Sequence, residues 1–279
     1  MTNETIKHQL NHRTIRAFKP TNLSAEQLNT LYSVASHTPT SMFMQQMSIM
    51  HITDPDKRAA IREISKQPYV GANGDLFILL VDLYRNQQIR QQKGKDDGRL
   101  HTADIFFQGL DDAIMAAQNM ITAAESMGLG VVPLGSIKND PQKIIEVLNL
   151  PKMTFPVLGL QIGIPDQEPQ LKPRLPLKFI AFDNDYPKEI KLSDLSDYDQ
   201  EVTTYYDLRD ANRRIDSFTN QIAGAKLDRH YTKRDEIMKV LCYTDKVFAL
   251  MKELISSSPQ EQLMSLRSHH NNFSLLRVY

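Results

Sequence analysis

The segment Leu76–Leu83 (LFILLVDL) constrains the fold more than any other part of the chain, because it is apolar at every position but one. A strand with one solvent-exposed face alternates polar and apolar residues, whereas a strand without a polar face is buried on both sides. The segment Phe155–Ile164 (FPVLGLQIGI) has a similar composition. We therefore expect a sheet that contains strands buried on both faces.

A long helix is expected over Asp104–Met127, because its apolar and alanine positions go almost all the way round. Such a helix is buried in a core or an interface, and Gly128 is a natural C-terminal stop. Another helix begins at Ser24, which can form a capping box with Gln27. Further strands are expected at 47–54 and 131–137, further helices at 55–66 and 139–150, and irregular chain at 86–100 and 165–185.

These elements mix helices and strands without a regular strand–helix–strand alternation, which predicts an α+β fold with a sheet packed on long helices. We expect one domain over residues 1–255, in which residues 187–255 form a more polar helical excursion. The remaining residues, 256–279, have no strong pattern and are expected to form a C-terminal tail.

The composition excludes several classes of function. Lysine and arginine (33) balance aspartate and glutamate (33), so the chain lacks the basic footprint that nucleic-acid binding needs. The single cysteine, Cys242, cannot form an internal disulfide or a cysteine-based zinc site, and the eight histidines show no metal-ligand spacing. No apolar run reaches the roughly 20 residues of a membrane helix, and the N-terminal residues lack the apolar core of a signal peptide. We expect a cytoplasmic protein without a bound metal, a nucleic-acid partner or a membrane partner.

Basic clusters are the strongest chemical signal in this neutral chain. The first lies at residues 11–16, where Arg13 and Arg16 can converge if the segment is helical or coiled. Guanidinium groups suit phosphate because they form forked, charge-assisted hydrogen bonds. A solvated basic turn is the alternative interpretation.

Two further basic clusters lie in the C-terminal half of the chain. In one, a proline stiffens the chain between Lys172 and Arg174, so this pair of cations could hold an anion, unless the segment is a surface linker. The other contains Arg209, Arg213 and Arg214, which are equally compatible with a phosphate site and with a solvated helix face.

Small polar segments lie between these clusters, at residues 38–41 with Gln45 and at Gly135-Ser136. Together with the cations they indicate a phosphorylated, ring-bearing ligand. No set of residues has the pattern of an acid–base pair or an activated nucleophile. This combination is typical of a protein whose cofactor performs the chemistry.

The chain resembles the nitroreductase family, in particular its branch of NADPH-preferring flavin reductases and oxygen-insensitive nitroreductases. The matching stretches, in order, are 12–18 (HRTIRAF), 38–45 (TPTSMFMQ), Gln67, 123–130 (AAESMGLG), 133–137 (PLGSI) and 171–176 (LKPRLP). The chain departs from the branch in having fewer hydroxyls at 38–42, Gly135-Ser136 in place of a glycine pair, and one residue less around Arg213-Arg214.

The resemblance implies a nitroreductase-like α+β fold, with a central mixed or antiparallel sheet flanked by helices, in an intertwined homodimer with two FMN sites at the subunit interface. The residues that it assigns to FMN are His12, Arg13, Thr14, Arg16, Thr40, Ser41, Gln45, Gln67, Pro133, Leu134, Gly135, Ser136, Lys172 and Arg174. The arginines of the first cluster would lie at the phosphate side. The resemblance also assigns Arg209, with Arg213 or Arg214, to the 2′-phosphate of NADPH.

The implied activity is ping-pong hydride transfer from NADPH, with NADH as an alternative donor, through FMN to a nitroaromatic compound, a quinone or free flavin. No side chain is expected to be an essential acid or base. Two alternatives stay open: a flavin-binding protein with a sensing or storage role, and another reductive enzyme on the same fold. Bleaching by NADPH would exclude the first alternative, and product analysis would separate the second.

Overall fold

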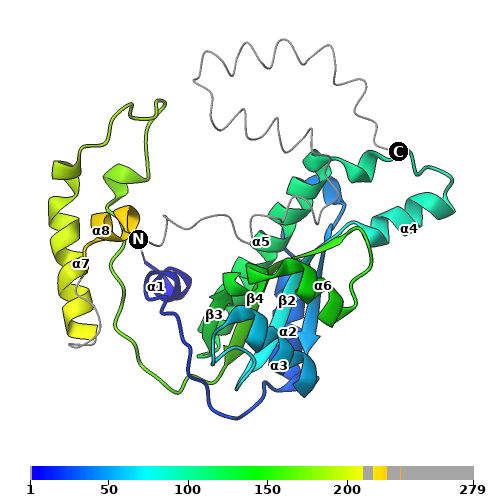
Figure 1. Ribbon diagram of the computed structural model, residues 1–279, viewed down its shortest axis with the longest axis horizontal. Helices are drawn as coiled ribbons and strands as arrows, with labels where there is room; N and C mark the ends of the chain where they lie inside the picture. Colours follow the sequence, from blue (N-terminus) through cyan, green and yellow to red (C-terminus); the bar gives the residue numbers. More distant parts are fainter. Residues whose placement is uncertain (1, 210–215, 225–232, 234–279) are drawn as a thin grey trace. The chain divides into compact units, whose positions relative to one another are not determined.

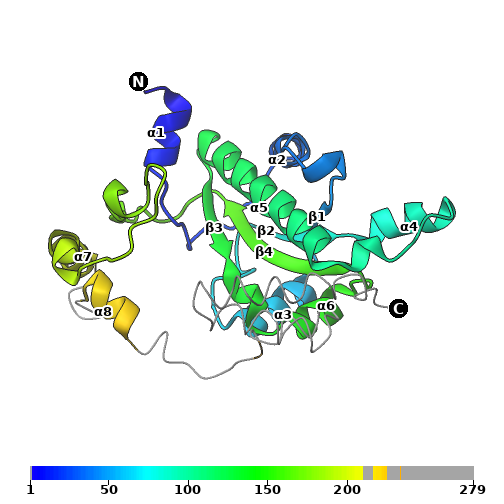
Figure 2. The same cartoon turned by 90° about the horizontal axis from the view of Figure 1, so that it is seen from above.

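The computed structural model describes residues 2–209, 216–224 and Lys233, which fall into two compact units. Unit 1 contains residues 2–10, 14–167 and Lys233, and unit 2 contains residues 11–13, 168–209 and 216–224. Figures 1 and 2 together label the α-helices and strands of both units.

Within the described residues, unit 1 is built on a four-stranded antiparallel sheet. Its strands are β1 (Met47–Ile52), β2 (Asp75–Asp82), β3 (Gly130–Leu134) and β4 (Thr154–Gly163), in the order β1-β2-β4-β3. Ile49 of β1 pairs with Leu79 of β2, and Phe77 of β2 pairs with Leu160 of β4. The two segments expected to be buried strands are thus the two central strands, and the α+β class is confirmed.

Helices cover both faces of this sheet, which explains why the central strands have no polar face (Figure 2). Phe77 and Leu79 of β2 pack with α2 (Ala25–Ser36) and α5 (Ala103–Ser126) in one core, and Leu76 and Ile78 pack with α3 (Pro55–Ser65) and α6 (Pro141–Leu148) in the other. The helices and 3-10 turns of unit 1 are α1 (Glu4–Leu10), α2 (Ala25–Ser36), η1 (Ser41–Phe43), α3 (Pro55–Ser65), α4 (Tyr84–Gln92), η2 (Arg99–His101), α5 (Ala103–Ser126), η3 (Gly135–Asn139) and α6 (Pro141–Leu148).

Helix ends follow the signals in the sequence. The capping box of α2 is formed: Ser24 Oγ accepts the Gln27 N–H (3.1 Å), and Gln27 Oε1 accepts the Ser24 N–H (2.9 Å). Asp140 caps α6 directly before Pro141. Gly128 follows α5 with a φ of 74°, a conformation that glycine adopts without steric cost.

The expected loop over 86–100 is wrong, because α4 and η2 occupy much of this segment. The sequence of α4 has no apolar face, so its helical period is hidden, but glutamine and arginine are good helix formers. Gln87 contacts His101 at 3.1 Å, and Arg90 pairs with Asp97 at 2.7 Å. These contacts hold a polar helix that the periodicity of the sequence does not reveal.

The strand expected over 131–137 is too long by three residues, because β3 ends at Leu134 and the chain continues as η3. The side-chain amide of Asn139 donates to the carbonyls of Ile64 (3.3 Å) and Ser65 (3.0 Å) at the end of α3. These hydrogen bonds draw the chain away from the line of the strand.

Residues 11–16 do not form the helix that was considered for them. Helix α1, which was not expected, ends at Leu10, and the chain then runs beside β3. The Ile15 N–H donates to the Val131 carbonyl (3.0 Å), and a Cβ on Gly130 would lie 2.7 Å from the Ile15 side chain. Only glycine permits this close approach, and Arg13 and Arg16 do not share a helix face.

Unit 2 contains α7 (Ser196–Arg209) and α8 (Phe218–Ala223) among its described residues, and the expected helical character after residue 187 is found there. Their side chains pack together: the Tyr198 and Phe218 rings lie 5.3 Å apart, and the Asp199 carboxylate accepts the Thr219 N–H (2.9 Å). The elements of unit 2 are η4 (Leu177–Phe179), η5 (Leu192–Leu195), α7 (Ser196–Arg209) and α8 (Phe218–Ala223). Cys242 and the expected tail, 256–279, lie outside the described residues.

Candidate functional site

The residues expected to bind a cofactor are divided between the two units. Unit 1 contains Thr14, Arg16, Thr40, Ser41, Gln45, Gln67, Pro133, Leu134, Gly135 and Ser136. Unit 2 contains His12, Arg13, Lys172 and Arg174.

Arg16 of unit 1 lies over an aromatic ring that was not expected from the sequence. Its guanidinium carbon is 5.9 Å from the centroid of the Tyr69 ring, and its side chain is exposed. The negative face of the ring attracts the cation. Two residues earlier, Thr14 forms an isolated bridge with Val131, so the backbone beside Arg16 is held by the sheet.

Residues 40–46, which we call loop 40–46, contain three of the expected residues and are held by a buried carboxylate. Asp112 of α5 is fully buried and accepts the N–H groups of Ser41 and Gln46, each at 2.9 Å. The Ser41 hydroxyl donates to Gln108 Oε1 (2.9 Å). A buried carboxylate with such bonds fixes the loop at both ends.

Loop 40–46 is strained. Met42, Phe43 and Gln45 have φ values of 50°, 57° and 50°, which cost L residues roughly 1–2 kcal/mol each. The side chains of Met42, Phe43 and Met44 are 60%, 82% and 49% exposed. Strain of this kind clusters at functional sites, where the surrounding structure maintains it.

Helix α4 also supports loop 40–46. The Arg85 guanidinium donates to the Gln45 carbonyl, and the Asn86 amide donates to the Met44 carbonyl (3.1 Å). Arg85 lies 3.6 Å from the Asp82 carboxylate. The helix that the sequence did not reveal is therefore part of the support for the site.

Gln67 follows Lys66, the left-handed C-cap of α3, and its carbonyl accepts the Val70 N–H (3.1 Å). Residues 69–74 form a second loop, which we call loop 69–74. Gly71 and Gly74 occupy its left-handed positions, with φ values of 64° and 73°. Gln67 thus lies between the end of a helix and a loop of defined conformation.

Two arginines of α3 bind the carbonyls of loop 69–74. Arg58 donates to Gly71 (3.0 Å) and Gly74 (2.6 Å), and Arg62 donates to Val70 (2.8 Å) and Gly71 (2.8 Å). Burial lowers the pKa of Arg58. The Asp75 carboxylate raises this pKa, and the neighbouring Arg62 lowers it further. The guanidinium remains charged at neutral pH, because arginine is not deprotonated in proteins.

The segment 133–136 lies at the end of β3. Leu134 is buried, Pro133 is exposed, and Gly135 and Ser136 are half-buried. Proline is tolerated where an edge strand faces outward, because it needs no partner for an N–H. A Cβ on Gly135 would have no atom within 4 Å, so the space beside this backbone is open to a flat group.

Arg13 of unit 2 carries an unsatisfied donor. Its Nε is buried and has no hydrogen-bond partner within the part of the chain that the structure describes. A buried donor without an acceptor costs about 1–3 kcal/mol, and more if it is charged. An anion such as phosphate would satisfy this group.

Lys172 and Arg174 line a cleft of about 580 Å³ within unit 2, together with Tyr198 and Phe218. Arg174 donates to the Lys172 carbonyl (2.6 Å). Burial raises the pKa of Tyr198; Glu201 raises it further, and Arg174 lowers it. The cleft therefore combines two cations with aromatic side chains, and neither ring was expected from the sequence.

The residues expected to bind the 2′-phosphate of NADPH lie at the limit of the described chain. Arg209 is the last residue of α7, and Arg213 and Arg214 lie outside the described residues. Their assignment stays a prediction.

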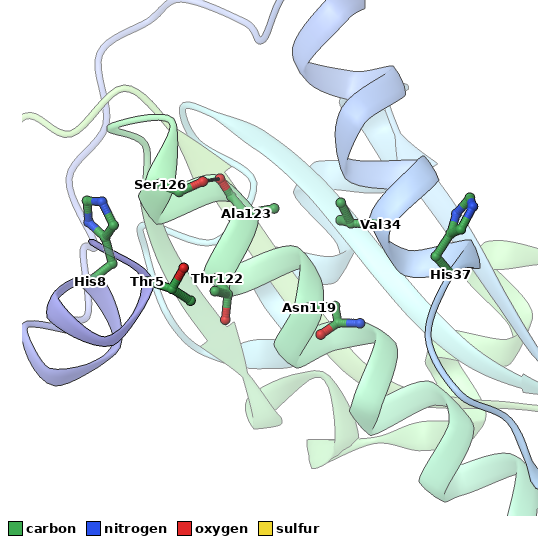
Figure 3. Close-up of a pocket in the computed structure, with 8 residues that line it drawn as sticks. All are labelled: Thr5, His8, Val34, His37, Asn119, Thr122, Ala123 and Ser126. Carbon is green, nitrogen blue, oxygen red and sulfur yellow. Dashed lines mark hydrogen bonds between the residues drawn. The ribbon is translucent and has the colours of Figure 1, made fainter. Parts of the chain in front are cut away.

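A separate cavity of about 380 Å³ lies between α1, α2 and α5 (Figure 3). None of the expected cofactor residues lines it. Thr122 and Ser126 donate to carbonyls of their own helix, at 3.1 and 2.8 Å, and the His37 ring bonds to the Ser33 carbonyl at 2.8 Å. These polar groups serve their own helices.

The described residues contain neither a metal-ligating cluster nor a membrane-spanning helix. Within residues 2–209, 216–224 and 233, no cluster of three or more histidine, cysteine, aspartate or glutamate side chains could hold a metal ion. No helix in the same residues has both the length and the apolar character needed to cross a membrane.

Known proteins resemble this chain over most of its length. The FMN reductase (NADPH) of Bacillus subtilis is 36% identical over 243 residues, which are 85% of this chain and 97% of that protein. The NADPH-dependent oxidoreductase of Staphylococcus saprophyticus is 38% identical over 219 residues, 77% of this chain and 87% of that protein.

Solved structures have the same fold. The NfrA1 nitroreductase of B. subtilis matches with a TM-score of 0.79 and 35% identity, and the NADPH:FMN oxidoreductase of Vibrio harveyi, complexed with NAD⁺, matches with 0.75 and 30%. Each match covers 86% of this chain and 97% of the other. The model of the nitroreductase family matches residues 10–164, and the model of the C-terminal domain of that family matches residues 172–243. This chain therefore belongs to the nitroreductase family.

Proposed function

We propose that this protein is an FMN-dependent NADPH oxidoreductase whose electron acceptors are nitroaromatic compounds, quinones or free flavin. The observation that carries the proposal is the 36% identity to an FMN reductase (NADPH) over 97% of that relative. The similarity to the NADPH:FMN oxidoreductase of V. harveyi supports the same cofactor and the same electron donor.

The donor set of the chain fits FMN. The buried Nε of Arg13 lacks an acceptor within the described residues, and phosphate is a suitable one. The open space beside Gly135 suits a flat ring. We assign His12, Arg13, Thr14 and Arg16 to FMN, with the arginines at its phosphate; Thr40, Ser41, Gln45 and Gln67 to its ring and ribityl chain; Pro133, Leu134, Gly135 and Ser136 to a position along the ring; and Lys172 and Arg174 to further phosphate and ring contacts.

When bound, FMN supplies the redox chemistry, accepting a hydride from NADPH and passing electrons to the acceptor. The side chains of the protein bind and orient the reactants. The cations neutralise the phosphate charge with charge-assisted hydrogen bonds. Asp112 keeps Ser41 in one position before any ligand binds, so binding does not have to order loop 40–46.

The proposed active form is a homodimer, in which each chain contributes one nitroreductase domain over residues 1–255 and a tail over 256–279. Phe107, Ile114 and Met115 of α5 are 44%, 44% and 39% exposed, and loop 40–46 exposes further apolar side chains. Exposed apolar surface of this kind marks interaction sites. We place the enzyme in the cytoplasm, because NADPH is an intracellular metabolite.

The dimer is tested by Ile114→Arg, which puts a charge into the proposed interface. Sedimentation equilibrium should show a dimer for the unmodified protein and a monomer for this variant. The control is Glu63→Arg on the exposed side of α3, which covers the other face of the sheet and should leave the dimer intact. An unmodified protein that stays monomeric with FMN bound would exclude the dimer.

The function is tested by the colour and the reduction kinetics of the purified protein. Protein loaded with FMN should be yellow, bleach with NADPH and recover its colour with a quinone. Yellow protein that is inert to both NADPH and NADH would be a flavin-binding protein without turnover. Protein that stays colourless in excess FMN would contradict the proposal.

The NADPH contact is tested with Arg209→Ala, by a stopped-flow comparison of NADPH and NADH in reducing the bound flavin. Loss of a hydrogen bond to a charged group, about 1.5–3 kcal/mol, should weaken the use of NADPH by roughly 10- to 100-fold and leave NADH almost unaffected. Equal losses for the two nucleotides would remove Arg209 from the 2′-phosphate site.

A further inference from the structure

Gln161 is a fully buried amide near the end of β4, and its neighbours along the strand, Leu160 and Ile162, are buried and apolar. Its backbone pairs with Leu76 of β2 and Val132 of β3, so the sheet itself does not use the side chain. A polar group in such a place is costly unless its hydrogen bonds are made. The side chain must therefore be satisfied by something outside the sheet.

The amide of Gln161 makes three hydrogen bonds, all with loop 69–74. Its Oε1 accepts the Gly71 N–H (2.7 Å). Its Nε2 donates to the carbonyls of Tyr69 (2.9 Å) and Asn73 (2.8 Å). One side chain thus holds three alternate residues of the loop, and the arginines of α3 hold the carbonyls of Val70, Gly71 and Gly74.

Loop 69–74 in turn holds the segment that contains Arg16, by two contacts. The Tyr69 ring lies under the Arg16 guanidinium, 5.9 Å from its central carbon. The Asn73 amide donates to the carbonyl of Phe18 (3.0 Å), two residues after Arg16, and the Phe18 side chain is buried. The loop therefore orients the Arg16 side chain and supports its segment on the side away from the Thr14–Val131 bridge.

We infer that Gln161 is a positioning residue for the phosphate-binding side of the site: it fixes loop 69–74, and the loop places the Tyr69 ring that holds the Arg16 guanidinium. The inference rests on the proposed function, in which Arg16 binds the phosphate of FMN. It adds Gln161 and Tyr69 to the residues that determine cofactor selectivity, and neither was expected from the sequence. Neither residue needs to touch the cofactor for this role.

The test compares the dissociation constants of FMN and riboflavin, which differ only in the phosphate. Both are measured by the quenching of flavin fluorescence with the full-length, cofactor-free protein. Gln161→Met keeps the shape of the side chain and removes the amide. We expect about a fivefold loss of FMN affinity, the size of one cation–π contact, and less than a twofold change for riboflavin.

A double-mutant cycle with Arg16→Ala separates positioning from general destabilisation. In the Arg16→Ala background, Gln161→Met should no longer change the ratio of the two dissociation constants. Val157→Ala, in a different core cluster of unit 1, is the stability control: it should lower the unfolding midpoint and leave the ratio unchanged.

Tyr69 provides an independent arm if Gln161→Met does not fold. Tyr69→Phe keeps the ring and should keep the selectivity for FMN, whereas Tyr69→Leu should lose it to the same extent as Gln161→Met. Equal losses for FMN and riboflavin, or a Gln161→Met effect that persists without Arg16, would overturn the inference. Unmodified protein that binds neither flavin would instead overturn the proposed function, and the inference with it.

Discussion

The two loops that support the proposed cofactor residues of unit 1 differ in their fully buried side-chain partner and in the residues at their left-handed positions. In loop 40–46, a buried carboxylate accepts backbone N–H groups, and the left-handed positions are occupied by Met42, Phe43 and Gln45. In loop 69–74, the neutral Gln161 amide both accepts a backbone N–H and donates to carbonyls, the arginines of α3 donate to further carbonyls, and glycines occupy the left-handed positions.

This difference follows from what each loop presents. Glycine would remove the strain of loop 40–46, but it would also remove the exposed side chains of Met42 and Phe43. Loop 69–74 uses its backbone as the point of attachment, so glycine at Gly71 and Gly74 loses nothing. Strain is therefore present in the loop that exposes large side chains from its left-handed positions, and it is absent in the loop whose left-handed positions are glycine.

The largest effect is expected from Asp112→Ala, which removes the support of loop 40–46. Two backbone donors lose their charged acceptor, so the free energy of unfolding should fall by about 3 kcal/mol. Urea denaturation followed by circular dichroism measures this change, and flavin affinity should fall with it.

Asp112→Asn refines the result. Its amide keeps one acceptor oxygen, so this variant should lose about half as much free energy of unfolding as Asp112→Ala. A loss below about 1 kcal/mol for Asp112→Ala would mean that water can replace the carboxylate. Loop 40–46 would then not depend on the buried anion.

Gly74→Ala should have the next largest effect and tests the scaffold loop. A Cβ would lie 2.9 Å from the Ile162 carbonyl at a φ of 73°, and the combined clash and strain should cost about 2 kcal/mol. The matched control is Gly94→Ala, where φ is 63° and a Cβ would meet no atom within 4 Å, so that only the strain of about 1 kcal/mol remains. Equal losses at the two positions would show that the tight contact at Gly74 is readily relieved.

The sequence predicts the elements whose signals are local. The apolar runs predicted β2 and β4, the capping box predicted the start of α2, and Gly128 predicted the end of α5. The resemblance supplied the expected cofactor residues, and the family membership that it implies is confirmed.

The supports of the site could not be predicted, because their partners are distant in the chain. Asp112 and Ser41 are separated by 71 positions, and Gln161 and Gly71 by 90. Gln161 is the polar exception in an apolar strand, a signal that could have been followed, but its partner could not be read from the pattern. Helix α4 was missed for a different reason, since it has no apolar face to give a period.

A pH-dependent contribution is expected on the scaffold side, from Asp140. This residue caps α6, and Asn139 beside it bonds to the last turn of α3, which holds loop 69–74. Burial alone raises the pKa of Asp140, but hydrogen bonds from the Lys233 ammonium and the Lys143 N–H outweigh it and hold the pKa below its ordinary value.

The stabilisation from Asp140 is therefore present above the pKa of the unfolded chain, near 4, and is lost as the pH falls through the lower pKa of the folded protein. Asp140→Ala should cost about 1 kcal/mol at pH 7, as for other N-caps. Denaturation between pH 7 and pH 3 should show this difference shrinking. Asp140→Asn keeps the cap without the charge, so its difference in free energy of unfolding from the unmodified protein should shrink as the pH falls. A difference that does not change with pH would mean that the charge of Asp140 is not the source of the pH dependence.

The smallest effect should come from Met42→Gly, and it has the opposite sign. At a φ of 50°, glycine relieves the steric cost of an L residue, which exceeds the backbone entropy that glycine adds to the unfolded chain, so the free energy of unfolding should rise by about 0.5 kcal/mol. Met44→Gly is the matched control, because Met44 is a similarly exposed methionine in the same loop with a φ of −83°. The free energy of unfolding of Met44→Gly should instead fall by about 0.5–1 kcal/mol. If both variants lose stability equally, the contacts of the Met42 side chain outweigh its backbone strain, and the contrast between the two loops would lie in their partners alone.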